Sequence, residues 1–178
     1  MSTFPPRKTV KQLMKEIGGK ITSRADKNYN CIAWSVGEKG RFIWPEFSNP
    51  RPTFDGNNGR KGHYWPFGDQ DSTLGNFLTF YEGEHGFSRC SPPEPGPSKH
   101  RERVVLYCYY SCSVLWVAHA SRQRPDGQWE SKLGVDEDIV HKRPEDLQDY
   151  YGCPLLQFLE RPRPASSTPK RRIIHRSR

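Results

Sequence analysis

Two long runs of β-branched and aromatic residues in the second half of the chain most constrain its fold. They are "ERVVLYCYY" at residues 102–110 and "VLWVAHASRQ" at residues 114–123, and residues of these types favour strands. The second run leads through the turn pair Asp126-Gly127 into "WESKLG", residues 129–134, and this dipeptide is a strong hairpin signal. The sequence therefore predicts an antiparallel meander of about three strands, to which "CPLLQFLERP" adds a further strand.

Helical spacing is confined to the first half of the chain. Apolar residues recur every three or four positions over residues 9–19 and 72–86, and a shorter helix is expected over residues 28–37. Asn28 or Asn30 would cap that short helix, and Gly37 would end it. Because helices precede strands instead of alternating with them, the order predicts an α+β fold.

Composition indicates one domain with much irregular structure. Only 33% of the 178 residues are hydrophobic, while Gly and Pro together contribute 31. Residues 38–72 show no sustained period, and we expect a long ordered loop there, held by Trp44, Trp65 and Phe67. The chain divides into an N-terminal extension with a short helix (1–27), the main α+β domain (28–162) and a disordered basic tail (163–178).

Positive charge is concentrated at the C-terminal end. Net charge is +8, yet residues 161–178 hold seven of the 28 Lys and Arg residues and no acid, which leaves 21 basic against 20 acidic residues elsewhere. Basic ends that contain Pro and Ser are more often solvated than bound. We therefore do not expect nucleic acid as the main partner, although association through the tail stays open as an alternative.

Cysteine usage and hydropathy predict a cytoplasmic protein. Five cysteines do not indicate a disulfide framework in a chain of this length, so we expect a reducing compartment. No window approaches the length of a membrane span, and no Sec-type export signal is evident. The sequence does not determine the oligomeric state.

The candidate chemistry begins with Cys31, at the expected start of the short helix. A helix N-terminus favours the reactive thiolate, and such a cysteine needs a histidine as its base. Among His63, His119 and His141, His119 is the best partner because it lies inside the strand expected at residues 114–123. Strict alternation along that strand would place it on the same face as Val117.

A third catalytic group is expected from the hairpin partner or just beyond it. Ser131, Lys132, Asp138 and His141 are all within range of His119 across the turn. Asp138 is chemically the best orienter, because carboxylates commonly hold a catalytic imidazole. Oxyanion support would come from backbone N–H groups or from Asn28 and Asn30.

Several motifs together resemble an uncharacterised family of small bacterial domains. That family shows an Asn-Cys-Ile-Ala-Trp block, a His-Ala-x-Arg-Gln strand, a Trp-x-Ser-Lys-Leu-Gly partner and a closing Tyr-Gly segment. The match covers residues 28 to 162 and rests on "NYNCIAWSVGE", "YWPFG", "HASRQRPDGQWESKLG", "EDIVH" and "YG…QFLERP".

The order of cysteine, then strand-borne histidine, is also similar to papain-like cysteine hydrolases and their NlpC-type branch. Trp34 follows Cys31 by three residues, as in papain, although the glutamine that completes papain's oxyanion hole is missing. The resemblance implies a papain-like fold with N-terminal helices on a sheet of about 3–5 strands. It also implies cofactor-free hydrolysis of a peptide, a peptidoglycan stem or a protein amide, as in some bacterial toxins and effectors.

Other interpretations of the same residues stay open. Cys31 and His119 can be buried core residues, since free cysteine is among the most buried residue types. Cys108, Cys112 and His119 have a spacing that superficially suits zinc, but no second Cys/His pair follows, so no metal is expected. A non-catalytic binding domain, gripping a partner through the aromatic loop of residues 41–67, is the alternative to an enzyme.

Overall fold

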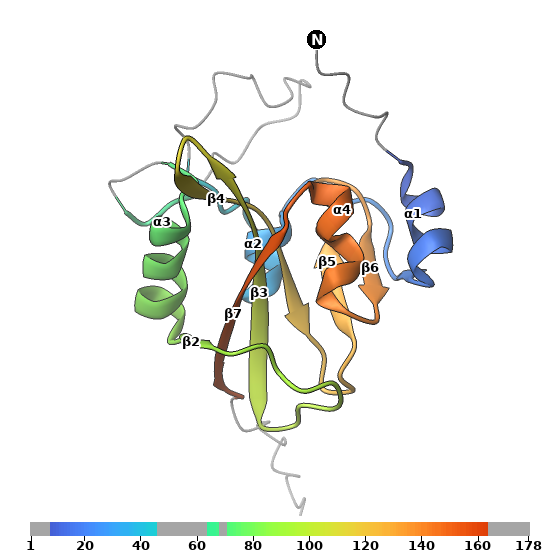
Figure 1. Cartoon of the computed structure of the whole chain (residues 1–178). Coiled ribbons are helices and arrows are strands. Elements are labelled where there is room, and N and C mark those ends of the chain that lie inside the picture. The colour runs from blue at the N-terminus through green and yellow to red at the C-terminus, as the bar shows by residue number, and fades with distance from the viewer. Residues whose placement is uncertain (1–7, 46–63, 68–70, 164–178) are drawn as a thin grey trace, which may run out of the picture.

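The computed structural model describes residues 8–45, 64–67 and 71–163. Its centre is a seven-stranded antiparallel sheet with the order β1-β6-β5-β4-β3-β7-β2 (Figure 1). The strands are β1 (Lys20–Ile21), β2 (Ser88–Cys90), β3 (Arg101–Ser111), β4 (Val114–Gln123), β5 (Trp129–Lys132), β6 (Asp138–His141) and β7 (Leu155–Pro162).

Short helices cover both faces of the sheet. In the view of Figure 1, α4 lies in front of the sheet and α2 behind it. A π-helical segment, Phe80–Glu84, continues α3, and a 3-10 turn, Pro144–Leu147, precedes α4. The α-helices are α1 (Val10–Ile17), α2 (Cys31–Ser35), α3 (Leu74–Thr79) and α4 (Gln148–Tyr151).

Alternation along the long strand β3 divides the interior into two cores. Val104 and Leu106 point to the face covered by α2 and α3, whereas Val105 and Tyr107 point to the face covered by α1 and α4. Because successive strand residues face opposite sides, β3 contributes to both cores at once. Its position between β4 and β7 therefore makes it the central element of the fold.

A β-bulge interrupts the pairing of β4 with β3. Tyr107 pairs with His119 but Cys108 pairs with Val117, so Ala118 is the extra residue. Val117 belongs to the core on the α2 face, whereas Ala118 packs against the core on the α4 face. One inserted residue reverses the alternation, so the side chains after Ala118 lie on the faces opposite to those that a regular strand would give them.

The predicted fold class is wrong. We expected N-terminal helices packed on a papain-like sheet of about 3–5 strands, whereas the protein is mostly a seven-stranded antiparallel sheet with few, short helices. The expectation failed because strands of two to four residues, namely β1, β2 and β6, carry too little periodicity to be recognised.

The hairpin across Asp126-Gly127 and the closing strand are confirmed, as β4–β5 and β7. Most of the aromatic loop predicted over residues 38–72 lies outside the described residues. Its anchors Trp44, Trp65 and Phe67 contact the core on the α2 face. Residues 10–21, predicted as part of an extension, supply α1 and the edge strand β1, which pairs with β6.

Candidate functional site

Cys31 is the first residue of α2 and lies against the sheet. It is only 5% exposed, and burial raises the pKa of its thiol to about 11. Backbone hydrogen bonds from Ala120 and Ile32 oppose that shift without cancelling it. At neutral pH the sulfur is therefore a buried thiol, and the five-residue helix does not convert it into a thiolate.

Asn30 caps α2 and ties the preceding chain to a neighbouring segment. Its side-chain oxygen accepts from the backbone N–H of Ala33 at 3.1 Å, and its amide donates to the carbonyl of Ile43 at 2.8 Å. The amide of Asn28 donates to Asp26 at 2.9 Å. Asn30 is buried and satisfied locally, so it does not present its amide to a reacting carbonyl beside Cys31, whereas Asn28 is exposed.

Lys132 and Asp138 lie on the same face as Cys31. The hydroxyl of Tyr29 donates to the carboxylate of Asp138 at 2.9 Å, and the ammonium of Lys132 lies 5.0 Å from the centre of the Tyr29 ring. Lys132 also donates to the carbonyl of Asp136. Burial lowers the pKa of Lys132, although the nearby carboxylates oppose this shift. The group is a closed polar cluster under α2.

His119 lies on the opposite face. It is 1% exposed, and its ring stacks on Tyr151 of α4 with centroids 4.0 Å apart, close also to Tyr107 of β3. The bulge at Ala118 is the cause, because without it His119 would share the face of Val117 and Cys31. The sheet separates the two side chains, so the structure does not form the expected Cys31–His119 pair.

Ser131 and His141 form a different pair on that same opposite face. The Nδ1–H of His141 donates to the carbonyl of Arg143 at 2.8 Å, which leaves Nε2 to accept from the Ser131 hydroxyl at 3.1 Å. Ser131 also shares a hydrogen bond with Ser121, whose hydroxyl lies 3.0 Å from that of Tyr107. Burial lowers the pKa of His141 to about 4.

This serine–histidine network has the connectivity of a catalytic dyad but not its access. Ser121 and Ser131 have no exposed surface, and His141 is 1% exposed. Because no substrate can reach these hydroxyls, we interpret the network as a satisfied polar element of the core.

The predicted site is therefore divided by the sheet. Cys31, Lys132 and Asp138, with Asn28 and Asn30 beside them, belong to the α2 side, and His119, Ser131 and His141 belong to the α4 side. The third candidate base, His63, lies outside the described residues. Among those described, no group of three His, Cys, Asp or Glu side chains is placed to hold a metal, and Cys112 is exposed at the β3–β4 turn.

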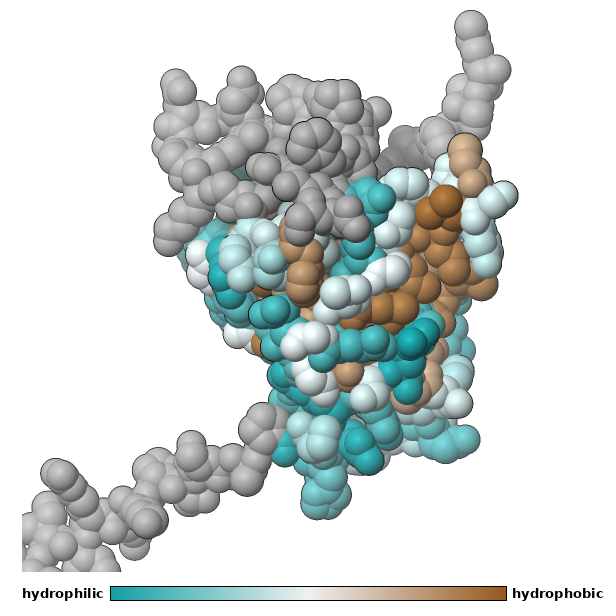
Figure 2. All heavy atoms as spheres, turned by 90° about the vertical axis from the view of Figure 1, so that its left-hand side faces the viewer, coloured by the Kyte–Doolittle hydropathy of each residue, from teal (hydrophilic) through white to brown (hydrophobic). Residues whose placement is uncertain are grey.

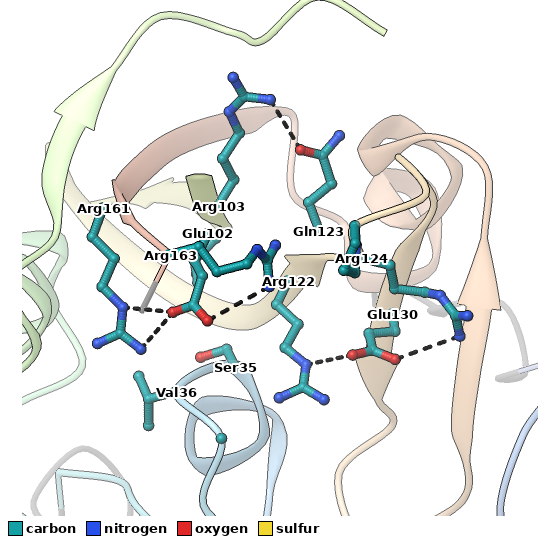
Figure 3. A pocket seen from close by; sticks show the side chains of 13 residues that line it. Ser35, Val36, Glu102, Arg103, Arg122, Gln123, Arg124, Glu130, Arg161 and Arg163 are labelled. Atoms are coloured by element: carbon teal, nitrogen blue, oxygen red, sulfur yellow. Dashed lines mark hydrogen bonds and ion pairs between the residues drawn. The ribbon is translucent and has the colours of Figure 1, made fainter. Parts of the chain in front are cut away.

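A pocket of about 240 Å³ opens at the end of the sheet where β4 and β7 end and β3 and β5 begin (Figure 3). The residues 35–37 at the C-terminal end of α2 form one wall. The remaining lining residues are Glu102, Arg103, Val104, Arg122, Gln123, Arg124, Pro125, Glu130, Arg161 and Arg163. Five arginines thus meet two carboxylates in one concave surface.

Each carboxylate lies between two arginines. Glu102 accepts from Arg161 at 2.7 Å and lies 3.6 Å from Arg163. Glu130 accepts from Arg122 and lies 3.9 Å from Arg124 (Figure 3). The pocket is therefore built from two carboxylate-bridged arginine pairs.

One arginine of each pair, Arg161 or Arg122, lies against an aromatic ring, and we call it the inner arginine. Its guanidinium is fixed in direction. Arg161 donates to the carbonyl of His85 at 2.7 Å and stacks on Phe87 at 4.5 Å. Arg122 donates to the carbonyl of Trp34 at 3.1 Å and stacks on the Trp34 ring at 4.0 Å. A stacked guanidinium loses less freedom when it binds a ligand, so both groups are preorganised donors.

The two outer arginines, Arg124 and Arg163, differ in how firmly they are held. Arg124 is 38% exposed, and its partners are Glu130 and the exposed Asp126 at 3.2 Å. Arg163 donates to the carbonyl of Arg101 at 2.9 Å. Arg124 can therefore turn towards a ligand at little cost, whereas Arg163 is held about as firmly as the inner arginines.

The pocket offers charge but no evident nucleophile. No Cys or His is among its lining residues, and the hydroxyl of Ser35 donates to the carbonyl of Ile32 at 2.8 Å. Tyr81 then donates to the Ser35 oxygen at 2.6 Å. The arrangement suits the binding of an anion, because guanidinium groups pair with carboxylate and phosphate in a fixed fork geometry.

These arginines were not predicted as a site from the sequence, although a signal was present. The triplets "RER" (101–103), "RQR" (122–124) and "RPR" (161–163) occur at the ends of three runs predicted as strands. Their strands, β3, β4 and β7, are neighbours, and the antiparallel order brings all three triplets to one end of the sheet. Five of the six arginines line the pocket.

Fold and pocket together define an antiparallel-sheet domain with an arginine-lined pocket. The chain belongs to the family described as a domain of unknown function (DUF7689), whose model matches residues 20–158. That range contains Glu102, Arg122, Arg124 and Glu130 and ends before Arg161. No curated protein and no solved structure matches the chain. Of the helices in the described ranges, none combines the length and apolarity of a membrane span.

Proposed function

We propose that this chain is a binding domain that holds an oxyanion in the arginine pocket. The observation that carries the proposal is a single pocket lined by five arginines and two carboxylates. Two carboxylates outside the lining, Glu160 and Asp126, pair with Arg103 and Arg124 and reduce the positive excess without removing it. Phosphate, sulfate and carboxylate groups share the chemistry that such a pocket recognises.

The position of the carboxylates supports binding in preference to a purely structural ion-pair network. One carboxylate can satisfy one guanidinium fork, yet Glu102 and Glu130 each lie between two arginines. Arg161 and Arg163 share Glu102, so excess positive charge remains beside that carboxylate, and a ligand anion would compensate it.

The cysteine hydrolase stays a prediction without support from the geometry. Its proposed nucleophile has a raised pKa, and its proposed base lies across the sheet. The binding-domain alternative is favoured over it because the arginine pocket is an accessible polar site, whereas Cys31 and His119 are buried.

Calorimetric titration with inorganic phosphate at low ionic strength tests the proposal. We expect saturable binding, weakened about tenfold by Arg124→Gln and by Arg163→Gln, because each variant removes one charge-assisted hydrogen-bond donor. Thermal melting of each variant checks that the fold is intact.

Arg89→Gln is the matched control. Arg89 is an exposed arginine on β2 that pairs with Glu82 at 3.0 Å, outside the pocket, so its loss should leave phosphate affinity within about twofold. Absence of heat and of thermal stabilisation up to about 10 mM phosphate would overturn the proposal, as would equal weakening by the control.

A further inference from the structure

The lining of the pocket offers a hydrogen-bond acceptor as well as guanidinium donors. The Oε2 atom of Glu102 lies 2.7 Å from both Nε and Nη2 of Arg161. Its second oxygen, Oε1, lies 3.6 Å from Nη1 of Arg163, which is an ion-pair distance and too long for a hydrogen bond. Within the described residues no donor is bonded to this oxygen, so Oε1 can still accept a hydrogen bond from a ligand.

The positive charge of the pocket is least compensated beside Glu102. Arg161 and Arg163 share this one carboxylate. In the other pair, Arg124 has a second carboxylate, Asp126, at 3.2 Å. An anion placed beside Glu102 would therefore meet two guanidinium groups and one carboxylate oxygen at the same time.

The surroundings and the size of the pocket suit a small inorganic ion. Strand β7 ends at the bottom of Figure 1, where β3 begins, and the pocket opens at this end of the sheet. Figure 2 shows hydrophilic residues over the lower part of the face, while apolar residues gather in its upper part. The pocket volume of about 240 Å³ is below the range of about 300–1,000 Å³ that is typical of sites for drug-sized ligands. A compact hydrophilic anion therefore fits this setting better than a large organic molecule.

We propose that Glu102 makes the pocket selective for an oxyanion that carries a proton, and thus for hydrogen phosphate over sulfate. The inference rests on the oxyanion pocket of the proposed function and adds which ion it prefers. Inorganic phosphate keeps at least one P–O–H group near neutral pH, and this group would donate to Oε1 of Glu102 while other phosphate oxygens accept from Arg161 and Arg163. Sulfate has no proton to donate there, so its oxygens would face a carboxylate oxygen that repels them and stays unpaired.

Glu130 provides a matched comparison in the same pocket. Its carboxylate also lies between two arginines, so a change from Glu to Gln at either position removes one negative charge. Only at Glu102 does the change also replace the acceptor beside the less compensated arginines. A glutamine amide can accept from hydrogen phosphate through its oxygen or donate to sulfate through its nitrogen, so Glu102→Gln should admit both ions.

Calorimetric titration of the whole chain with inorganic phosphate and with sulfate, at neutral pH and equal ionic strength, tests the inference. We expect phosphate to bind at least about tenfold more tightly than sulfate. Glu102→Gln should strengthen sulfate binding at least about tenfold and phosphate binding only about threefold. Glu130→Gln should strengthen the binding of both ions about threefold and so keep the preference. Thermal melting checks that each variant is folded.

The other outcomes separate the inference from the proposed function. Equal affinity of the parent chain for phosphate and sulfate would overturn the inference and leave the oxyanion pocket standing, and this measurement needs no variant. A preference that survives Glu102→Gln, or that Glu130→Gln removes to the same extent, would overturn the role of Glu102. Binding of neither ion would overturn both the inference and the proposed function.

Discussion

Polar residues in the middle of the sheet differ from those at its arginine end. In the middle, Ser131, His141 and Lys132 are buried and bonded to defined partners. At the end, Arg124 and Arg163 stay partly exposed and share their carboxylates with other arginines. Residue types that are common in catalytic and binding sites thus occur in both regions. Of the two regions, only the arginine end combines uncompensated positive charge with exposure to solvent.

Solvent access and charge balance distinguish a candidate binding site from a structural network. The Ser131–His141 pair has the hydrogen bonds of a catalytic dyad and no exposed surface. The arginine pocket has no nucleophile among its lining residues but has room for a ligand.

The middle of the sheet should make stability depend on pH. The pKa of His141 is about 4 in the folded chain, below its value of about 6.5 when unfolded, so the unfolded chain binds the proton first as the pH falls. The free energy of unfolding should therefore decrease by about 3 kcal/mol between pH 6.5 and pH 4. Urea denaturation across this range measures the effect.

His141→Gln provides the comparison, because His85 also has a pKa lowered by burial and adds a background of the same sign. In this variant, most of the decrease in unfolding free energy between pH 6.5 and pH 4 should be absent. A variant that keeps the full decrease would show that His141 is not the buried group responsible.

Cysteine reactivity should follow exposure. Cys112 is exposed at the β3–β4 turn, whereas Cys31 is buried and its pKa is raised to about 11. Iodoacetamide labelling followed by mass mapping should modify Cys31 at least about 100-fold more slowly than Cys112 at neutral pH. Faster labelling of Cys31, lost in His119→Ala, would instead restore the hydrolase prediction.

Removing one hydroxyl should reveal the structural role of the buried network. Ser131→Ala leaves Nε2 of His141 without its donor, which should cost about 1–2 kcal/mol of unfolding free energy. Ser88→Ala, an exposed serine on β2, should change it by less than about 0.5 kcal/mol. Equal effects of the two substitutions in urea denaturation would contradict the assigned role.

Neutralising a pocket carboxylate should strengthen anion binding. Glu102→Gln or Glu130→Gln raises the net charge of the pocket by one and releases guanidinium donors, so phosphate affinity should rise about threefold. Calorimetry measures the change, with Glu82→Gln outside the pocket as the control. A fall in affinity would mean that the carboxylates are needed to aim the arginines.

Regular elements of the fold were predictable because they depend on local patterns. The strands β3, β4, β5 and β7 and the cap at Asn30 follow from residue type and spacing. The short strands at the sheet margins were not predictable, because tertiary pairing defines them.

The expected pairing of Cys31 with His119 depended on the face of a single residue. Alternation placed His119 on the face of Val117, but the bulge at Ala118 moved it to the opposite face. No local signal marks this bulge in the sequence. The three Arg-x-Arg triplets were visible, yet their convergence depends on the strand order, which sequence spacing alone does not give.

The most direct test of the arginine pocket is an NMR titration that follows the Nε–Hε signals of the arginine side chains during addition of phosphate. We expect saturable shifts for Arg122, Arg124, Arg161 and Arg163, with the signal of Arg89 unchanged. Uniform small shifts of all arginines, or none, would contradict the pocket as an anion-binding site.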